Sequence, residues 1–256
     1  MPLPPLECIV YGPVPSRRLG RSLGINLLPA GMKVCNMNCA YCQYGWARGA
    51  TRYRGRRNGW PSADAVEAAF ASRLQRAAES GELIDRITVA GHGEPTLHPE
   101  FEDVTERLRV VRNRIAPTIP LAILSNSTTA GWDDVRLGLR RYDERYMKLD
   151  AGDPITYARI NGPGASIVDV VDALASLPSI VVQAMFVMDA ESEIDNSTDG
   201  AVAEWIGAVE RVPATAVHIY TIDRVPALES LLKVPRRRLR EIAERVRTLQ
   251  IPATVF

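Results

Sequence analysis

Three of the four cysteines lie within eight positions of one another, in the stretch KVCNMNCAYCQYG at residues 33–45. Cys35, Cys39 and Cys42 have the spacing C-x3-C-x2-C, so three thiolates can converge from one short loop. Thiolates hold iron–sulfur clusters, and a cluster of four irons takes one ligand per iron. The triad therefore predicts a four-iron cluster with one iron open to a bound molecule.

Two other kinds of site compete with this interpretation. A structural zinc ion usually has four protein ligands in two pairs. Here the fourth ligand would have to be Cys8, His92, His98 or His218, and none of them lies in a matching pair. An iron–sulfur electron carrier or a metal sensor would also use cysteines, but would ligate the cluster fully. Cys8 itself is expected to be a small buried apolar residue.

Composition limits the class of protein. The chain has 256 residues, of which 46% are hydrophobic and 24% charged, and its formal net charge is +1. These values are typical of globular proteins and argue against a general attraction to nucleic acid or membranes. No apolar run approaches the ~20 residues that a membrane span needs, and the N-terminus lacks a signal-peptide pattern. We expect a cytoplasmic protein, in which clustered cysteines indicate a metal or catalytic role.

Apolar runs alternate with amphipathic patterns along the chain. Strands are expected at residues 22–28, 87–91, 121–126, 145–150, 180–188 and 216–222. Their near-continuous apolar character is typical of parallel strands that are covered on both faces. Six β–α units in series predict an α/β fold with an open or partial (β/α) barrel, whose chemistry lies at the C-terminal ends of the strands.

Helical patterns fall between these strands. Ser62 is expected to cap the first helix, and Pro235 to begin the last one. Pro163 and Gly164 interrupt any helix between about 155 and 176. The expected buried faces are Val66, Phe70 and Leu74; Phe101, Val104, Leu108 and Val111; Val168, Val171 and Leu174; Ala203, Ile206 and Val209; and Leu239, Ile242 and Val246.

The triad follows the first predicted strand and has an aromatic residue, Tyr41, directly before its last cysteine. This arrangement resembles the radical S-adenosylmethionine (radical SAM) superfamily. The resemblance implies a partial (β/α)6 barrel, a [4Fe-4S] cluster on the three cysteines, and SAM bound at the open iron near Tyr41. In that family an electron from the cluster cleaves SAM to methionine and a 5′-deoxyadenosyl radical, which removes a hydrogen atom from the substrate.

The second predicted strand runs into AGHGEPT at residues 90–96. This stretch resembles the glycine-rich motif of the family, which implies SAM contacts by Gly91, Gly93, Glu94 and Pro95. An ammonium group is held well by a carboxylate, here Glu94, and by backbone carbonyls that glycines let approach closely. Taken alone, the same letters also fit a tight turn with a helix cap.

Further polar residues end the next three strands. Ser125 and Asn126 are expected to bind the ribose hydroxyls or the carboxylate of SAM, although an Asn–Ser turn explains each of them equally well. Lys148 is expected to meet the SAM carboxylate, and Asp150 the ribose or the substrate; the two could also form an internal ion pair. Gln183 interrupts an apolar strand, so it is expected to face the barrel interior, where a ligand could satisfy its amide.

The last predicted strand reads HIYTIDR from His218 to Arg224. Alternation places His218 and Tyr220 on one face. Asp223 and Arg224 fall at the strand end, where they could form a structural ion pair or a clamp for the substrate. All four residues are candidates for substrate binding.

The stretch YGPVPSRRLGRSLGIN at residues 11–26, together with GHGEPT, KLD and YTIDR, resembles one branch of the superfamily. That branch comprises short iron–sulfur oxidoreductases similar to tRNA 4-demethylwyosine synthase. The synthases bind a second cluster through three cysteines ahead of the triad, whereas this chain has only Cys8 there, so no second cluster is expected. The substrate is left open among a small molecule, an RNA base and a peptide, and a separate flavodoxin- or ferredoxin-type reductant is expected.

Residues 46–60, WARGATRYRGRRNGW, interleave five arginines with three aromatic residues. Arginine pairs with phosphate and aromatic rings stack on bases, so this segment could contact nucleic acid. A solvated loop, or a surface for an anionic small molecule or an acidic peptide, explains the segment as well. The whole chain is expected to form one domain, with an extension at 1–21, a barrel core at 22–222 and a C-terminal helix and strand at 223–256.

Overall fold

The computed structural model describes residues 3–47, 59–189 and 194–256. Its centre is an eight-stranded sheet in the order β1-β2-β3-β4-β5-β6-β8-β10. The strands are β1 (Val10–Ser16), β2 (Gly20–Ile25), β3 (Arg86–Val89), β4 (Leu121–Ser125), β5 (Glu144–Lys148), β6 (Ile180–Met185), β8 (Ala214–Tyr220) and β10 (Ala253–Val255). All neighbouring strands are parallel except β1 and β2 at one edge, which are antiparallel.

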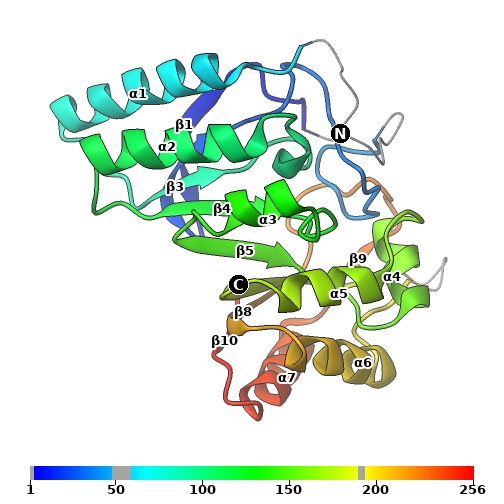
Figure 1. Cartoon of the computed structure of the whole chain (residues 1–256). Helices are drawn as coiled ribbons and strands as arrows, with labels where there is room; N and C mark the ends of the chain where they lie inside the picture. Colours follow the sequence, from blue (N-terminus) through cyan, green and yellow to red (C-terminus); the bar gives the residue numbers. More distant parts are fainter. Residues whose placement is uncertain (1–2, 48–58, 190–193) are drawn as a thin grey trace.

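Helices connect the parallel strands and follow one another along the sheet, from α1 and α2 at one end to α6 and α7 at the other (Figure 1). Their bounds are α1 (Ala63–Ser80), η1 (Pro95–Leu97), α2 (Phe101–Ile115), α3 (Asp133–Leu139), α4 (Pro154–Asn161), α5 (Ile167–Ala175), α6 (Asp199–Glu210) and α7 (Arg236–Arg247). This is a partial α/β barrel, as the alternation of patterns predicts. Ser62 caps α1 by accepting a hydrogen bond from the Ala65 amide at 3.2 Å.

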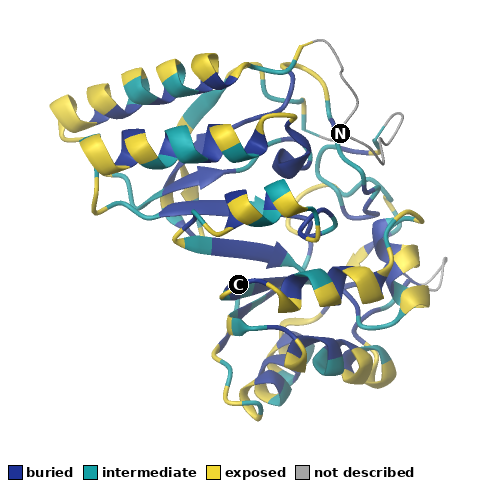
Figure 2. Ribbon diagram, in the orientation of Figure 1, coloured by how far each residue is buried: buried dark blue, intermediate teal, exposed yellow. Residues whose placement is uncertain are grey.

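The core lies between the sheet and the helices. Figure 2 shows the strands largely buried, while the helices carry buried residues on one side and exposed residues on the other. Phe70 of α1, Phe101 of α2 and Trp205 of α6 are among the largest fully buried side chains. Burying a large apolar side chain contributes roughly 1.5–3 kcal/mol, so this layer holds the strand ends in place.

Two predicted helix faces are wrong in part. Val168 is 50% exposed, because α5 buries Ile167, Val170, Val171 and Leu174 instead. Apolar residues stand at almost every position at the start of α5, so their spacing does not fix which side faces inward.

In α6 the residues expected to be buried included Ala203 and Ile206. Ala203 is exposed and Ile206 half-buried, and the buried residues are Val202, Trp205, Ala208 and Val209. The large indole of Trp205 decides this face, and its Nε1 donates to the Leu149 carbonyl at 2.9 Å.

The strand predicted at residues 180–188 is also divided. It leaves the main sheet after Met185, and β7 (Val187–Met188) pairs with β9 (Leu232–Lys233) in a separate two-stranded sheet.

The hairpin of β1 and β2 reaches across the barrel from one edge of the sheet. At its tip, Arg17 forms an ion pair of 2.9 Å with Asp223, which follows β8. The neighbouring Arg18 donates to the side chain of Gln183 on β6 at 2.7 Å. Residues expected to form an N-terminal extension therefore contribute β1 and the hairpin tip, which contact the far side of the barrel.

In the part of the chain that the structure describes, no helix combines the length and the apolar character that a membrane crossing requires.

Candidate active site

The cysteine triad lies on the loop that follows β2. Cys39 is buried, and Cys35 and Cys42 are half-buried. The loop is fixed against the C-terminal end of α4, because the amides of Asn38 and Ala40 donate to the carbonyls of residues 161 and 160 at 3.0 and 2.8 Å. Helix α4 ends there at Asn161, before the predicted break at residues 163 and 164. Helix α4 thus ends at the point where its last two carbonyl groups accept hydrogen bonds from the cysteine loop.

Each of the three thiols accepts a hydrogen bond from a different side chain. Lys33 Nζ lies 3.1 Å from the sulfur of Cys42. Asn161 Nδ2 lies 3.3 Å from that of Cys39, and Asn126 Nδ2 lies 3.7 Å from that of Cys35. Hydrogen bonds to the sulfur atoms stabilise thiolates and are one means by which proteins tune iron–sulfur clusters.

Burial acts in the opposite direction while the thiols are free. It raises the pKa of Cys35 to about 12, and it also raises the pKa of Cys39. Cys35 and Cys39 are therefore protonated at neutral pH while they are free, and binding a metal must release their protons. Three buried or half-buried sulfurs on one loop, each with an N–H donor, fit a cluster of thiolate ligands.

Among residues 3–47, 59–189 and 194–256, no three His, Cys, Asp or Glu side chains, the three cysteines included, are grouped as a single metal ion requires. The histidines considered as a fourth zinc ligand include His92 and His98. His92 accepts from the Leu6 amide and contacts the Pro29 carbonyl, both at 3.0 Å, and His98 contacts the Pro61 carbonyl at 2.8 Å. Both rings therefore have structural partners.

The expectation that Cys8 is buried is wrong, because its side chain is exposed. It lies before β1 at the edge of the sheet, where the strands and helices do not cover it.

The glycine-rich motif holds the end of β3 against the start of the cysteine loop. A Cβ atom on Gly93 would lie 1.8 Å from the carbonyl oxygen of Val34, and one on Gly91 would lie 2.3 Å from the side-chain oxygen of Asn26. The amide of Glu94 donates to that same Val34 carbonyl at 2.9 Å. Both glycines are thus required by close protein contacts, and Pro95 begins the short helix η1.

Glu94 is 1% exposed and connects the ends of β3 and β4. Its Oε1 accepts from the amide and hydroxyl of Thr96 at 3.1 and 2.6 Å and from the hydroxyl of Ser125 at 2.9 Å, and its Oε2 accepts from the Asn126 amide at 2.6 Å. Burial raises the pKa of Glu94, although these hydrogen bonds act to lower it. A carboxylate has about four acceptor directions, so Oε2 keeps one for a further donor.

Asn126 joins this group to the cysteine loop. Besides the Cys35 sulfur, its Nδ2 contacts the side-chain oxygen of Asn36 at 2.8 Å, and its Oδ1 accepts from the amide of Thr128 at 3.0 Å. The structure therefore brings the predicted residues Glu94, Ser125 and Asn126 together beside the triad. No sequence pattern predicts that Asn36 belongs to this group.

A second polar group lies behind Cys39. Asp150 is fully buried, and its Oδ2 accepts from the hydroxyl of Tyr41 and, at 3.0 Å, from Asn161 Nδ2. Lys148 Nζ donates to the Tyr41 hydroxyl at 2.8 Å and lies 3.8 Å from Asp150. Burial acts to lower the pKa of Lys148, but attraction to Asp150 and its neighbours outweighs burial, so the pKa is raised and the ammonium stays charged.

The hydroxyl of Tyr41 is thus engaged by protein groups. Burial and the nearby Asp150 raise the pKa of Tyr41, so the phenol keeps its proton.

Lys148, Gln183 and His218 are direct neighbours on β5, β6 and β8. Gln183 Oε1 accepts from Arg18 at 2.7 Å and from the Tyr220 hydroxyl at 3.3 Å. His218 lies between the rings of Tyr146 and Phe256, with centroids 5.6 and 4.8 Å away. Burial and the charge of Arg18 lower the pKa of His218 to about 4, so its ring is neutral at pH 7.

The other candidates lie at or beyond the edge of this group. Asp223 pairs with Arg17 at 2.9 Å and with Lys233 at 3.9 Å instead of with Arg224, and both Asp223 and Arg224 are exposed. Most of the arginine-rich segment, residues 48–58, lies outside the described residues. Of its ends, Trp46 is exposed, and the ring of Trp60 packs edge to face against His98.

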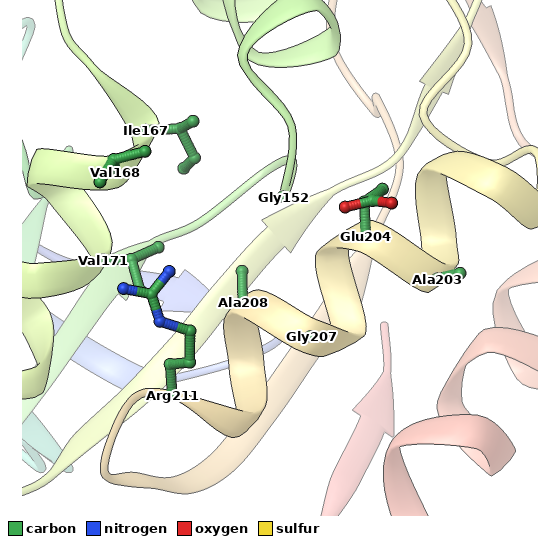
Figure 3. A pocket seen from close by; sticks show the side chains of 9 residues that line it. All are labelled: Gly152, Ile167, Val168, Val171, Ala203, Glu204, Gly207, Ala208 and Arg211. Atoms are coloured by element: carbon green, nitrogen blue, oxygen red, sulfur yellow. The ribbon is translucent and has the colours of Figure 1, made fainter.

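A surface hollow of about 340 Å³ lies between α5 and α6 (Figure 3). Apolar side chains of α5, including Ile167 and Val171, face Glu204 of α6 and Arg211, which directly follows α6, across it. None of the residues that line it belongs to the triad or to the polar groups described above. The hollow is therefore not part of the candidate site.

The family model of the Radical SAM superfamily matches residues 31–195, which include the triad and the ends of β3 to β6. The chain belongs to the radical SAM superfamily. Proteins of this superfamily use a [4Fe-4S] cluster and SAM, and one structure that this chain resembles, Streptococcus suis SuiB, contains bound SAM.

The curated relatives include proteins named UPF0026. The one from Methanocaldococcus jannaschii is 37% identical over 161 residues, which cover 62% of this chain and 46% of the relative. One from Helicobacter pylori strain J99 is 27% identical over 223 residues, which cover 84% of this chain and 67% of the relative. The match thus spans about half the length of the Methanocaldococcus protein.

Solved structures support the same fold at low sequence identity. A radical SAM methyltransferase from Sphaerobacter thermophilus superposes with a TM-score of 0.66 at 15% identity, covering 92% of this chain and 65% of that chain. Archaeal TYW1 superposes with a TM-score of 0.52 at 13% identity, covering 89% and 72%. The predicted wyosine-synthase branch is thus represented only by a distant structural neighbour.

Proposed function

We propose that Cys35, Cys39 and Cys42 hold the [4Fe-4S] cluster and that the chain catalyses reductive cleavage of SAM followed by hydrogen abstraction from a substrate. The observation that carries this proposal is the set of three thiols on one loop, each with its own N–H donor. When bound, the cluster supplies the electron that splits SAM into methionine and a 5′-deoxyadenosyl radical.

The protein's own part is to position SAM and to keep the site dry. We propose SAM contacts at the ends of β3, β4 and β5, by Gly91, Gly93, Glu94, Pro95, Ser125, Asn126 and Lys148. Glu94 Oε2 keeps an acceptor direction for an ammonium group, and the charged Lys148 suits a carboxylate. Tyr41, Asp150 and Asn161 hold Lys148 and Cys39 in a fixed relation by hydrogen bonds.

We propose that a flavodoxin- or ferredoxin-type protein supplies the electron. The rival function is an electron carrier or sensor with a fully ligated cluster. It differs in one measurable respect, since such a protein does not cleave SAM.

The test is anaerobic reconstitution with iron and sulfide, followed by addition of dithionite and SAM. We expect 5′-deoxyadenosine and methionine in equal amounts. Cys39→Ala should lose both the cluster and the cleavage, whereas Cys8→Ala, a matched control outside the triad, should keep both. A protein with an intact cluster that forms no 5′-deoxyadenosine would refute the enzyme, and a cluster that survives in Cys39→Ala would refute the ligand assignment.

A further inference from the structure

Inside the barrel, two buried polar atoms of β6 and β8 have no hydrogen-bond partner among the described residues. They are Nε2 of Gln183 and Nδ1 of His218. Gln183 is only 5% exposed, so water does not readily replace the missing partner. A buried donor left unsatisfied destabilises the protein, so a ligand that accepts from this amide would relieve that cost.

Arg18 brings positive charge to the same place. Its guanidinium lies 2.7 Å from Gln183 Oε1 and 4.3 Å from the ring centroid of Tyr220. Two other cations facing the interior have carboxylate partners, since Arg86 pairs with Glu144 at 2.7 Å and Lys148 lies 3.8 Å from Asp150. Arg18 forms no ion pair with an Asp or Glu of the described ranges, and most of its five N–H donors remain available.

We propose that Arg18, Gln183 and His218 form a subsite for an anionic group, a carboxylate or a phosphate, of a small-molecule substrate. Arginine binds both groups through two parallel hydrogen bonds, and the free amide hydrogens of Gln183 add a third donor beside it. The neutral His218 ring can donate from one nitrogen without adding charge. This assignment deepens the proposed function and rests on it for the identity of the reaction.

The position of the subsite favours a small molecule over a nucleic acid. It lies on the inner face of β6 and β8, one strand away from Lys148 of the proposed SAM site. The β1–β2 hairpin covers it through Arg17 and Arg18. A nucleic acid needs an open surface, so an interior position favours a compact anion.

The test uses the full chain without a loaded cluster and two probes, inorganic phosphate and malonate. Binding is measured by calorimetry and by the rise in melting temperature, against chloride at equal ionic strength. We expect Arg18→Gln to weaken phosphate binding at least tenfold. Gln183→Glu should do the same, because it places a carboxylate beside Arg18 that occupies the guanidinium.

The control is Arg240→Gln, which removes an exposed arginine of α7 outside the subsite, and it should change phosphate affinity less than twofold. Equal losses in Arg240→Gln and Arg18→Gln would overturn the subsite, because binding would then follow surface charge. Wild-type affinity in both Arg18→Gln and Gln183→Glu would overturn it too, as would binding of tRNA without binding of either probe. A preference between phosphate and malonate identifies which anionic group the subsite takes.

A second measurement separates this subsite from the SAM carboxylate. Cluster-loaded wild-type protein is titrated with phosphate in the absence and presence of saturating SAM. We expect the two phosphate affinities to agree within about twofold. Competition between SAM and phosphate would assign these residues to SAM and overturn the proposal. Because the first titrations need no cluster, they decide the anion subsite even where the SAM-cleavage assay refutes the proposed function.

Discussion

Gly93→Ala should detach the end of β3 from the cysteine loop. The added Cβ would lie 1.8 Å from the Val34 carbonyl oxygen, whereas real Cβ contacts are almost never below 3.0 Å, so the two must separate by at least 3.0 − 1.8 = 1.2 Å. The hydrogen bond from the Glu94 amide to the same carbonyl, now 2.9 Å, would not survive a shift of that size. Losing it costs about 1 kcal/mol, and leaving the buried amide and carbonyl unpaired raises the total to roughly 2–4 kcal/mol.

Two measurements test this reasoning. Denaturant unfolding of the cluster-free protein should give a free energy of unfolding lower by about 3 kcal/mol in Gly93→Ala. Iron and sulfide content after reconstitution should also fall, because Val34 directly precedes Cys35. Gly207→Ala is the control: it lies within α6 with no heavy atom near the added Cβ, and should gain up to about 1 kcal/mol. Wild-type stability and cluster content in Gly93→Ala would show that the motif does not position the loop.

Three further changes probe other parts of the molecule. Lys33→Met removes the donor 3.1 Å from the Cys42 sulfur. It should lower the reduction potential of the cluster by roughly 60 mV, the equivalent of about 1.4 kcal/mol for one electron. An unchanged potential in a redox titration followed by electron paramagnetic resonance would contradict this. Ser62→Ala should lower the free energy of unfolding by about 1 kcal/mol through loss of the α1 cap, with Ser80→Ala as the comparison at the other end of the helix. The third change concerns His218, whose pKa falls from 6.5 to about 4 on folding. Between these two pH values the unfolded chain binds a proton at His218 and the native protein does not. The free energy of unfolding therefore decreases as the pH falls from about 6.5 to 4. The full pKa shift corresponds to about 3 kcal/mol, which solvent at this partly exposed ring reduces to about 1–2 kcal/mol. In His218→Gln, the free energy of unfolding measured at several pH values should depend less on pH by that amount. The same pH dependence in the variant and the wild type would argue against this reasoning.

The fold and the main features of the site could be predicted from the sequence because they depend on local patterns. Continuous apolar runs identify parallel strands, and three cysteines in eight positions need no distant partner to be noticed. Polar residues at strand ends converge because parallel strands end at the same side of the sheet. This rule, together with the resemblance to the radical SAM family, predicted that Glu94, Ser125 and Asn126 lie beside the triad.

Contacts between distant segments could not be predicted in this way. Asn161 is 122 positions from Cys39, and its spacing to the triad carries no signal. Arg18 was visible in the SRRLG stretch, but only the fold shows that the hairpin reaches β6. Lys33, two residues before Cys35, is the exception, since its closeness to the triad was a usable sign. The prediction of the buried helix face was wrong where apolar residues surround the helix, as at Val168. There, packing against the sheet decides which side is buried, and the spacing of apolar residues does not.

The polar groups inside the barrel fall into two classes, and the difference bears on specificity. At the ends of β3 and β4, Glu94 and Asn126 are already held by protein donors and acceptors, so this part of the site is rigid before any ligand binds. On β6 and β8, Gln183 and His218 keep buried atoms that find no hydrogen-bond partner in the described part of the chain. A pre-formed set of contacts suits a cofactor that is the same in every turnover. Unsatisfied atoms discriminate more strongly between ligands, because only a ligand with a matching hydrogen-bonding group relieves the cost of burying them. The choice of substrate should therefore respond more to changes at β6, β8 and Arg18 than to changes at β3 and β4.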